Sequence, residues 1–375
     1  MAPRRRRLKT LPDANRDFIS ELPVEVKERI LECLPTRDAA RTALLSRHWR
    51  DVWLQHERLT FDCEFLQSLQ DNGDRTLVNI INNILFFRAG PVKKFTLDIN
   101  AAYGPSPQQF DFDKWCLFLS RNGVEELNIF LYSYLEPDYQ LPCCILSCRT
   151  IKKLIVEGPF IDLPVNACGI FSNVTSLAFL NVEFKRSVNG IASSISIPKL
   201  EKLALEHCDG IGEFEISPPK LEILSVIGSI YEFVHSRWLV PHFKAIKTLW
   251  LCGSSLECMR VSMFPTAINL RVLKLYELKF GYHRKQLISS MQLLQKCPNL
   301  CELQILGDEL GSEDDNEMND LEDRNGRLFI QELHMLNTIK IEDFSDESAL
   351  GMLYMKTLLS KYPALERVVI VKPSH

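Results

Sequence analysis

Long apolar runs are missing from this sequence, and no stretch approaches the ~18 consecutive apolar residues that a membrane-spanning helix needs. An apolar stretch is also missing after the basic residues Arg4–Arg7, so no secretory signal peptide is predicted. An excess of charge of one sign is missing as well, because the net charge is −4 and the pI is near 6.1. We therefore expect neither a membrane nor nucleic acid as a partner.

Glycine is scarce, with 16 residues in 375, and cysteine contributes only 12. Together with 46% hydrophobic and 25% charged residues, this composition excludes collagen, coiled-coil, disordered and disulfide-rich miniprotein classes. A chain of this length can bury a large core. It predicts two or more structural units, since a domain usually holds ~100–200 residues.

Motifs that carry catalytic or metal chemistry are absent too. The sequence has no GxxxxGK phosphate loop, no strand-linked GxGxxG, no GxSxG elbow and no HExxH. Cys143, Cys144 and Cys148 lie close together without a nearby histidine, and the pair Cys297 and Cys301 has no second pair. In a reducing compartment such thiols pack as small apolar side chains. We expect no cofactor, no metal site and no catalytic residue.

What the sequence does contain is an internal repeat. The pattern apolar-x-x-apolar-x-apolar occurs in eleven copies that are spaced 21 to 36 residues apart. An ordinary alternation of strands and helices is the alternative, but eleven copies at this spacing favour leucine-rich repeats. The copies begin at Val92, Val124, Ile151, Val174, Leu200, Leu221, Ile246, Leu270, Leu300, Leu336 and Leu365.

Each copy of this pattern supplies one short strand whose apolar residues point inward. A single copy cannot bury its own apolar face, so neighbouring copies stack and share one core. The connections are expected to hold helices or irregular turns, for example a helix over 284–296 in which Leu287, Met291 and Leu294 recur at helical spacing. The predicted fold class is α/β, with a solenoid whose parallel sheet lines a concave surface for binding a macromolecule.

A different kind of unit precedes the repeats, because residues 17–53 predict three short helices. Pro23 suits the first turn of the first helix, and Thr36 and Ser46 can cap the second and third. Three such helices hold too little mass to bury their own apolar side chains. Several of these are therefore expected to be buried against a partner, namely Leu22, Ile30, Leu34, Leu45 and Trp49.

The segment LPVEVKERILECLPTRDAARTALLSRHW resembles an F-box, since its LP, IL, LP, RD, LS and W fall at that family's spacing. The segments VNIINNILFFRAGPVKKFTLDI and ELHMLNTIKIEDFSDESALGMLYMKTLLSKYPALERVVI are similar to the plant F-box/leucine-rich-repeat/FBD family. The chain departs from that family at Arg88, where histidine is common, and at Ser345-Asp346, where glycine is common. The expected units are a disordered basic tail at 1–15, an F-box at 16–60, a leucine-rich-repeat solenoid at 76–307, an acidic loop insertion at 308–327 and an FBD segment at 328–375 that continues the array.

The resemblance implies that the F-box docks on the Skp adaptor of an SCF-type cullin–RING ubiquitin ligase, in the nucleus and/or the cytoplasm. The repeats would hold an unknown protein substrate for ubiquitination, and the chain itself would not be an enzyme. Leu22 and Trp49 are expected to be exposed interface anchors rather than internal core. The positions that match the adaptor-binding pattern are Leu22, Pro23, Ile30, Leu34, Leu45 and Trp49.

Two other functions stay open at this point. One is a repeat-based scaffold or inhibitor that does not recruit a cullin. The other is a cysteine-dependent enzyme on a repeat scaffold, which would need an exposed thiol of low pKa beside a base.

Two charged segments also allow two interpretations each. Arg4–Arg7 and Lys9 fit a nuclear import patch or a solvated tail. Residues 308–327 hold nine acidic and two basic residues at the longest spacing of the array. They fit a solvated loop insertion or a contact for a basic substrate.

The outward-facing positions of the repeats suggest where a target binds. The third, fifth and seventh positions of each copy are polar in the first copies and become apolar from the copy at Leu221 onward, where Cys252 is also expected to face outward. The alternatives are a segment that folds across this face or a register shift of one residue. The predicted substrate-binding residues, with Ile227, Trp250 and Tyr276 as near neighbours, are Ile223, Ile227, Trp250, Val272 and Tyr276.

Overall fold

The computed structural model describes residues 17–70, 77–100, 107–132, 139–163, 169–185, 194–210, 215–228, 239–258, 261, 264–280, 284–307, 333–343, 349–359 and 362–371. The segments 1–15 and 308–327, for which the sequence suggests a basic tail and an acidic insertion, lie outside the described residues. Within the described ranges, no helix combines the length and the apolar character that crossing a bilayer requires.

Three short helices open the described chain: α1 (Val24–Cys33), α2 (Thr36–Thr42) and α3 (Arg47–Gln55). Pro23 and Pro35 directly precede α1 and α2, where the missing proline N–H costs no helical hydrogen bond. Ser46 caps α3 as predicted, because its Oγ accepts a hydrogen bond of 3.4 Å from the backbone N–H of Trp49.

Thr36 does not cap α2 as predicted. It is the first residue of the helix, and its buried Oγ1 accepts a hydrogen bond of 2.8 Å from the backbone N–H of Thr60. Thr60 belongs to the first strand of the sheet, so the side chain serves a contact between helix and sheet that the local sequence does not reveal.

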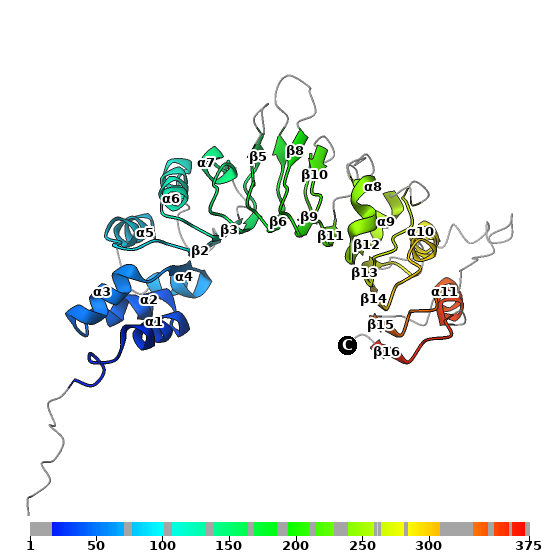
Figure 1. The fold of residues 1–375 in the computed structure, drawn as a ribbon, viewed down its shortest axis with the longest axis horizontal. Helices are drawn as coiled ribbons and strands as arrows, with labels where there is room; N and C mark the ends of the chain where they lie inside the picture. The colour runs from blue at the N-terminus through cyan, green and yellow to red at the C-terminus, as the bar shows by residue number, and fades with distance from the viewer. Residues whose placement is uncertain are drawn as a thin grey trace, which may run out of the picture.

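Twelve parallel strands form one curved sheet, and they line the inner side of an arch (Figure 1). Each of the eleven predicted repeat copies supplies one strand, which confirms the predicted solenoid. In order across the sheet the strands are β1 (Arg58–Phe61), β2 (Lys94–Asn100), β3 (Glu126–Tyr132), β4 (Lys153–Glu157), β6 (Ser176–Leu180), β9 (Lys202–Glu206), β11 (Ile223–Ile227), β12 (Thr248–Cys252), β13 (Val272–Leu278), β14 (Glu302–Gly307), β15 (Thr338–Glu342) and β16 (Arg367–Val371).

Strand β1 is a twelfth copy that the sequence pattern does not reveal. Arg58 pairs with Lys94 in β2, and Lys94 is the third residue of its copy, so the first position of the β1 copy is His56. The copy therefore reads His-x-x-Leu-x-Phe, with a histidine where the other copies have an aliphatic residue. Leu59 and Phe61 occupy the next two core positions, and both are fully buried.

Helices cover the outer side of the arch near both of its ends (Figure 1). The repeat that begins at Leu200 is only 21 residues long, which leaves little room for a helix, and the middle of the array carries two small sheets instead: β5 (Ile161–Asp162) with β7 (Phe184–Lys185), and β8 (Ser194–Ser196) with β10 (Glu215–Ser217). The helices are α4 (Cys63–Gln70), α5 (Leu77–Phe86), α6 (Gln109–Arg121), α7 (Cys143–Leu146), α8 (Leu239–His242), the 3-10 helix η4 (Phe243–Ala245), α9 (Gly253–Cys258), α10 (Arg284–Gln295) and α11 (Ala349–Leu359).

One hydrophobic core runs through the described chain, from Leu31 of α1 to Tyr362 before β16. The central repeats show its pattern clearly, because inward residues such as Leu154 and Val156 are fully buried. The F-box helices contribute Trp49 and Trp53 to the same core. The N-terminal helices and the repeats are therefore one packed body rather than two units joined by a linker.

Several strands of the sheet end at a residue in the left-handed conformation. After β4 this residue is Gly158, with φ +96°, and after β6 it is Asn181, with φ +49°. The N–H of Asn181 donates to the carbonyl of Glu206 in the next repeat at 2.8 Å. At Gly158 a Cβ would lie 2.1 Å from the carbonyl oxygen of Leu131, so only glycine fits there.

Candidate partner-binding surfaces

The F-box end of the arch carries a surface that is rich in exposed apolar side chains. Val26 and Ile30 lie one turn apart on an exposed side of α1, and the buried Leu31 lies on another side. Leu44 and Leu45 follow α2. We call the following set the F-box apolar surface: Phe18, Ile19, Val24, Val26, Ile30, Leu44 and Leu45.

The six positions that match the adaptor-binding pattern differ in their exposure. Leu45 is 59% exposed, Ile30 is 37% exposed, and Pro23 is exposed as well. Leu22 and Leu34 are half-buried against the hydrophobic core. Ile30 and Leu45 are thus available to a partner without any rearrangement, whereas Leu22 and Leu34 offer only part of their surface.

Trp49 corrects the expectation of an exposed anchor, because its side chain is only 2% exposed. The ammonium of Lys27 lies 5.8 Å from the centre of the indole ring and donates a hydrogen bond of 2.7 Å to the carbonyl of Ser20. The segment before α1 is thereby held against the α1–α3 contact. This contact covers part of the indole that the three helices alone are expected to leave exposed.

The junction between the F-box and the repeats contains two residues with no role in the sequence-based predictions. Arg88 donates a hydrogen bond of 2.8 Å from Nη1 to the carbonyl of Trp53, and its guanidinium lies 5.5 Å from the centre of the Trp53 ring. Burial lowers the pKa of Arg88 to about 10. Burial, followed by the nearby charge of Arg88, lowers the pKa of His56 to about 4, so His56 is neutral at pH 7.

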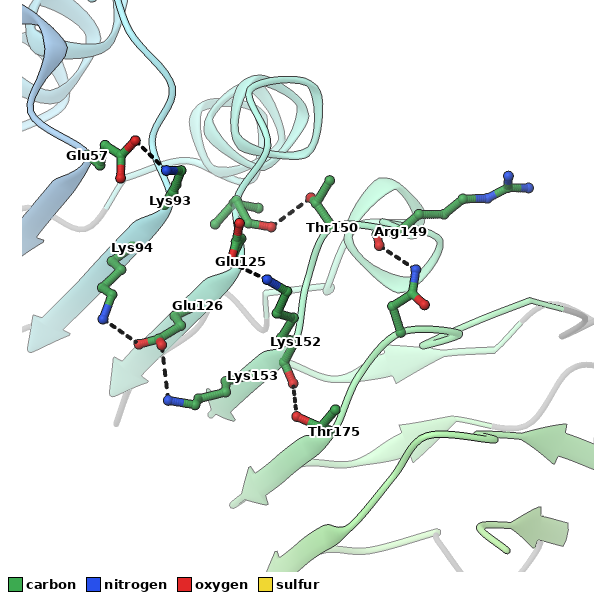
Figure 2. A network of polar contacts seen from close by, with 12 residues as sticks. Glu57, Lys93, Lys94, Glu125, Glu126, Arg149, Thr150, Lys152, Lys153 and Thr175 are labelled. Atoms are coloured by element: carbon green, nitrogen blue, oxygen red, sulfur yellow. Dashed lines mark hydrogen bonds and ion pairs between the residues drawn. The ribbon is translucent and has the colours of Figure 1, made fainter. Parts of the chain in front are cut away.

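A charged ladder crosses the starts of the first strands (Figure 2). Lys93 pairs with Glu57 at 2.5 Å, and Lys152 pairs with Glu125 at 2.5 Å. Glu126 lies between two lysines and contacts both of them, Lys94 at 3.4 Å and Lys153 at 3.0 Å (Figure 2). Because opposite charges alternate from strand to strand, the ladder favours the observed register.

A groove of about 1260 Å³ lies beside this ladder, between α1 and strands β1–β3. Its walls mix acidic and basic side chains, so it favours no ligand of a single charge sign. The residues that line it include Glu28, Glu32, Arg58, Thr60, Lys94 and Asn128.

The predicted substrate-binding residues lie on strands β11, β12 and β13, and all five are half-buried rather than enclosed in the core. The rings of Trp250 and Tyr276 are near neighbours, as expected, with centroids 5.9 Å apart. Lys274 lies between them in sequence and places its ammonium 4.4 Å from the centre of the Trp250 ring. Burial, and then the charge of Glu342, raises the pKa of Tyr276, which keeps its hydroxyl protonated.

The neighbours of Trp250 on its other side are small. Ser225 stands opposite Trp250 in the sheet, and Ala204 and Ala178 follow in the same row. The indole Nε1 is buried and has no hydrogen-bond partner among the described residues. The residues beside the tryptophan are thus small, with Ser225 buried and Ala204 and Ala178 partly accessible, and Ser225 rather than Ile227 lies directly across from Trp250.

Cys252 was expected to face outward with Trp250, and this is wrong because Cys252 is fully buried. Its Sγ accepts a hydrogen bond of 3.0 Å from the N–H of Gly228 and lies 3.1 Å from Oγ of Ser255. Helix α9 begins directly after β12, so the chain has already turned toward the core at this residue.

Thiol chemistry is disfavoured by the environments of the buried cysteines. Burial raises the pKa of Cys208 to about 11 and that of Cys297 to about 12. A nucleophilic cysteine needs the opposite shift. Among the described residues, no group of three or more His, Cys, Asp or Glu side chains could hold a metal ion.

Comparison with protein-family models matches residues 19–61 to the F-box domain. Residues 86–236 match the LRR domain of the At1g61320/AtMIF1 type. The two matches fall on the helical end of the arch and on the first part of the sheet that follows it.

Several proteins of Arabidopsis thaliana are similar over longer stretches. The F-box/FBD/LRR-repeat protein At1g13570 is 29% identical, over 94% of this chain and 91% of the relative. The F-box/LRR-repeat protein At5g02910 is 26% identical, over 76% of this chain and 59% of the relative. The F-box/FBD/LRR-repeat protein At5g56420 is 30% identical, over 58% of this chain and 50% of the relative. The last two relatives are thus matched over only half to three-fifths of their length.

Proposed function

This chain belongs to the plant F-box/leucine-rich-repeat/FBD protein family, and we propose on that basis that it is the substrate-recognition subunit of an SCF-type ubiquitin ligase. Its F-box binds the Skp adaptor and through it a cullin, and its repeats hold a target protein. Members of such F-box families are typically non-catalytic subunits. The chain contributes position rather than reacting groups, because it raises the effective concentration of target lysines near the charged conjugating enzyme.

The observation that carries the adaptor-binding role is the F-box apolar surface. Exposed apolar side chains on neighbouring elements usually mark a binding site, and here they lie within the segment that matches the F-box domain. Ile30 and Leu45 are the anchors with most support, since both match the family pattern and both are exposed. Leu22, Pro23 and Leu34 contribute the parts of their surface that stay accessible. Trp49 does not contact the adaptor in this proposal. It is a buried core residue of α3, which packs against α1 and thereby supports the exposed anchors.

The proposed target site is the concave surface at β11–β13, with Ile223, Ile227, Trp250, Val272 and Tyr276. Two features support it. The two aromatic rings are in contact and partly accessible. The row beside them is formed by small residues, of which Ala204 and Ala178 are partly accessible.

Adaptor binding is tested with the double variant Ile30→Asp/Leu45→Asp. Capture of the Skp adaptor by the full chain is expected to fall at least about tenfold, because interface anchors each contribute on the order of 1–2 kcal/mol or more. Leu117→Asp, on α6 and 41% exposed, is the matched control and leaves capture unchanged. Unchanged capture by the double variant would contradict the proposed docking surface. Capture of the adaptor without a cullin would instead support the scaffold or inhibitor function.

Target binding is tested by affinity capture with the cullin pathway blocked, followed by mass spectrometry. Trp250→Ala and Tyr276→Ala are each expected to lose the proteins that the unaltered chain enriches, while adaptor capture and the melting temperature stay the same. Thr96→Ala, on the concave side of β2, is the control and keeps the same captured proteins. If both aromatic variants retain these proteins, the target binds elsewhere on the chain.

A further inference from the structure

The seventh positions of six consecutive repeat copies form one row across strands β2, β3, β4, β6, β9 and β11, on the inner side of the arch (Figure 1). They face outward, because the residue before each of them is buried in the core. Each member is paired in register with the next, so neighbours lie ~4.8 Å apart. Acidic and apolar residues alternate along this acidic–apolar row, which consists of Asp98, Phe130, Glu157, Leu180, Glu206 and Ile227.

Most side chains of this row remain partly accessible. Five of the six are half-buried, and only Glu157 is buried, where Asn181 donates a hydrogen bond of 2.9 Å from Nδ2 to its Oε1. Burial, followed by the charges of Asp62 and Glu157, raises the pKa of Asp98. The row therefore concentrates negative charge among half-exposed apolar side chains.

The charged ladder at the strand starts provides a contrast within the same sheet. There Glu126 contacts Lys94 and Lys153 on the two neighbouring strands, so the ladder balances much of its own charge. The acidic–apolar row contains no basic residue, and among the described residues no ion pair joins Asp98 or Glu206 to a basic side chain. Lys94 is four residues from Asp98 along β2, a distance of ~13 Å. A bound partner can supply the positive charge that this row lacks.

The row continues directly into the proposed target site. Ile227 belongs to both, and it is paired with Glu206 at the last step of the row. Trp250 and Tyr276 lie on the next two strands, β12 and β13. A target that covers the aromatic rings and continues along the arch therefore meets the carboxylates next.

We propose that the target presents lysine or arginine side chains to the carboxylates of the acidic–apolar row, with apolar side chains between them. This assignment rests on the proposed target-binding function and makes it more specific, because it names the chemistry of the target surface. Each apolar group of the target lies against Phe130, Leu180 or Ile227. Consecutive carboxylates are two strands apart, so the basic groups of the target are spaced by ~10 Å along the sheet.

The alternation suits a target that is both charged and apolar. Apolar neighbours exclude water around each carboxylate, which strengthens its attraction to a bound cation. They also hold the carboxylates two strands apart, which limits their mutual repulsion when no target is bound. The same negative charge repels nucleic acid and anionic membranes, so the occupant is a protein surface.

The first test uses synthetic peptides and the purified full chain. The probes are peptides of ~15 residues, long enough to follow most of the row even when helical, in which arginine and leucine alternate at every second, third or fourth position. Matched peptides carry glutamate in place of arginine. Fluorescence anisotropy is expected to show binding of arginine–leucine peptides with at least one spacing, and no binding of the glutamate–leucine peptides. Absence of binding by every arginine–leucine peptide up to about 100 µM would overturn the proposal.

A pair of matched double variants places this binding on the row. Asp98→Asn/Glu206→Gln should weaken binding of the arginine–leucine peptide at least about tenfold, because two charged contacts are lost. Glu125→Gln/Glu126→Gln removes the same charge from the strand starts and should leave binding unchanged. Equal melting temperatures show that both variants are folded. Equal weakening by the two variants would mean that net charge rather than the row attracts the peptide, and it would overturn the proposal.

Charge reversal provides an independent check. Asp98→Lys/Glu206→Lys should bind the glutamate–leucine peptides in preference to the arginine–leucine peptides, because the sign of the row is then inverted. A retained preference for arginine would contradict the proposed contact.

The amide variant also separates this proposal from the proposed target site. In affinity capture with the cullin pathway blocked, Asp98→Asn/Glu206→Gln should lose the proteins that the unaltered chain enriches, as Trp250→Ala does. If only the aromatic variants lose them, the target site stands and the role of the acidic–apolar row is wrong. If only the row variant loses them, the row is supported and the aromatic site is wrong. Retention by both kinds of variant would contradict both.

Discussion

The hydroxyl groups of Ser290 and Tyr354 lie 3.1 Å apart, and both are fully buried. This hydrogen bond joins α10 to α11, and it bridges 64 positions of the sequence, including the whole acidic segment. Burial raises the pKa of Tyr354 to about 12. The C-terminal segment is thus attached to the repeats by a buried polar contact as well as by strand pairing.

Tyr354→Phe should lower the free energy of unfolding by ~1 kcal/mol, because it removes one buried hydrogen bond and leaves the ring in place. Tyr362→Phe is the matched control, since the buried Tyr362 hydroxyl has no hydrogen-bond partner among the described residues and its removal should cost less. Urea unfolding of both variants measures the difference. A larger loss at Tyr362 than at Tyr354 would contradict this assignment.

The stability of the protein should depend on pH through His56. Its pKa in the folded state is about 4, below its ordinary value of 6.5, so the unfolded chain binds the proton more readily. Stability should therefore fall as the pH drops from 6.5 toward 4. His56→Leu places at this core position an aliphatic residue like those of the other copies. It should remove the loss of stability between pH 6.5 and 4 that protonation of His56 causes. Melting temperatures of both proteins across this range provide the measurement, and parallel curves would exclude His56 as the cause.

Trp49→Ala should destabilise the F-box by ~3–5 kcal/mol, as the loss of a large core side chain usually does. Its effect on adaptor binding would follow from that unfolding. Leu44→Ala, at a side chain that is 87% exposed, should leave the helices folded. Hydrogen exchange over residues 24–55 distinguishes the two variants. If the amides of residues 24–55 stay protected from hydrogen exchange in Trp49→Ala, the indole is not needed for folding, and its role as an interface anchor would be supported instead.

Glu126→Ala should change the free energy of unfolding by less than ~1 kcal/mol, although Glu126 contacts two lysines. The three side chains are partly or largely exposed, and exposed ion pairs contribute little. Chemical denaturation at low and at high salt tests this, since the difference between the variant and the unaltered chain should shrink with salt. A loss of several kcal/mol would mean that the ladder determines the register by itself.

The sequence predicts the repeat strands well because each strand is marked by an apolar pattern within six consecutive residues. It misses β1 because His56 stands at the first position of that copy, and only the pairing of Arg58 with Lys94 reveals the repeat. The burial of Trp49 is missed for a different reason. It depends on Lys27, which binds the segment before α1 and covers the indole, and on a hydrophobic core that continues into the repeats, and a local pattern contains no information on such contacts.

The concave residues show the same division between local and distant information. The alternation of side chains along β12 predicts that Trp250 faces outward and meets Tyr276. It cannot predict that the chain turns inward at Cys252, because that turn is set by α9.

The pairing of β1 with β2 has a consequence for geometry in the proposed ligase. The F-box and the repeats share one core. The orientation of the F-box on the adaptor would therefore fix the orientation of every strand and of a target bound to the repeats. Neighbouring strands are ~4.8 Å apart, so each added or deleted repeat would shift the target by a fixed step and turn it by a fixed angle. In the proposed ligase, the number of repeats sets the distance between the adaptor and the target. The length of the arch, as well as the surface that binds the target, therefore determines which target lysines come within reach of ubiquitin.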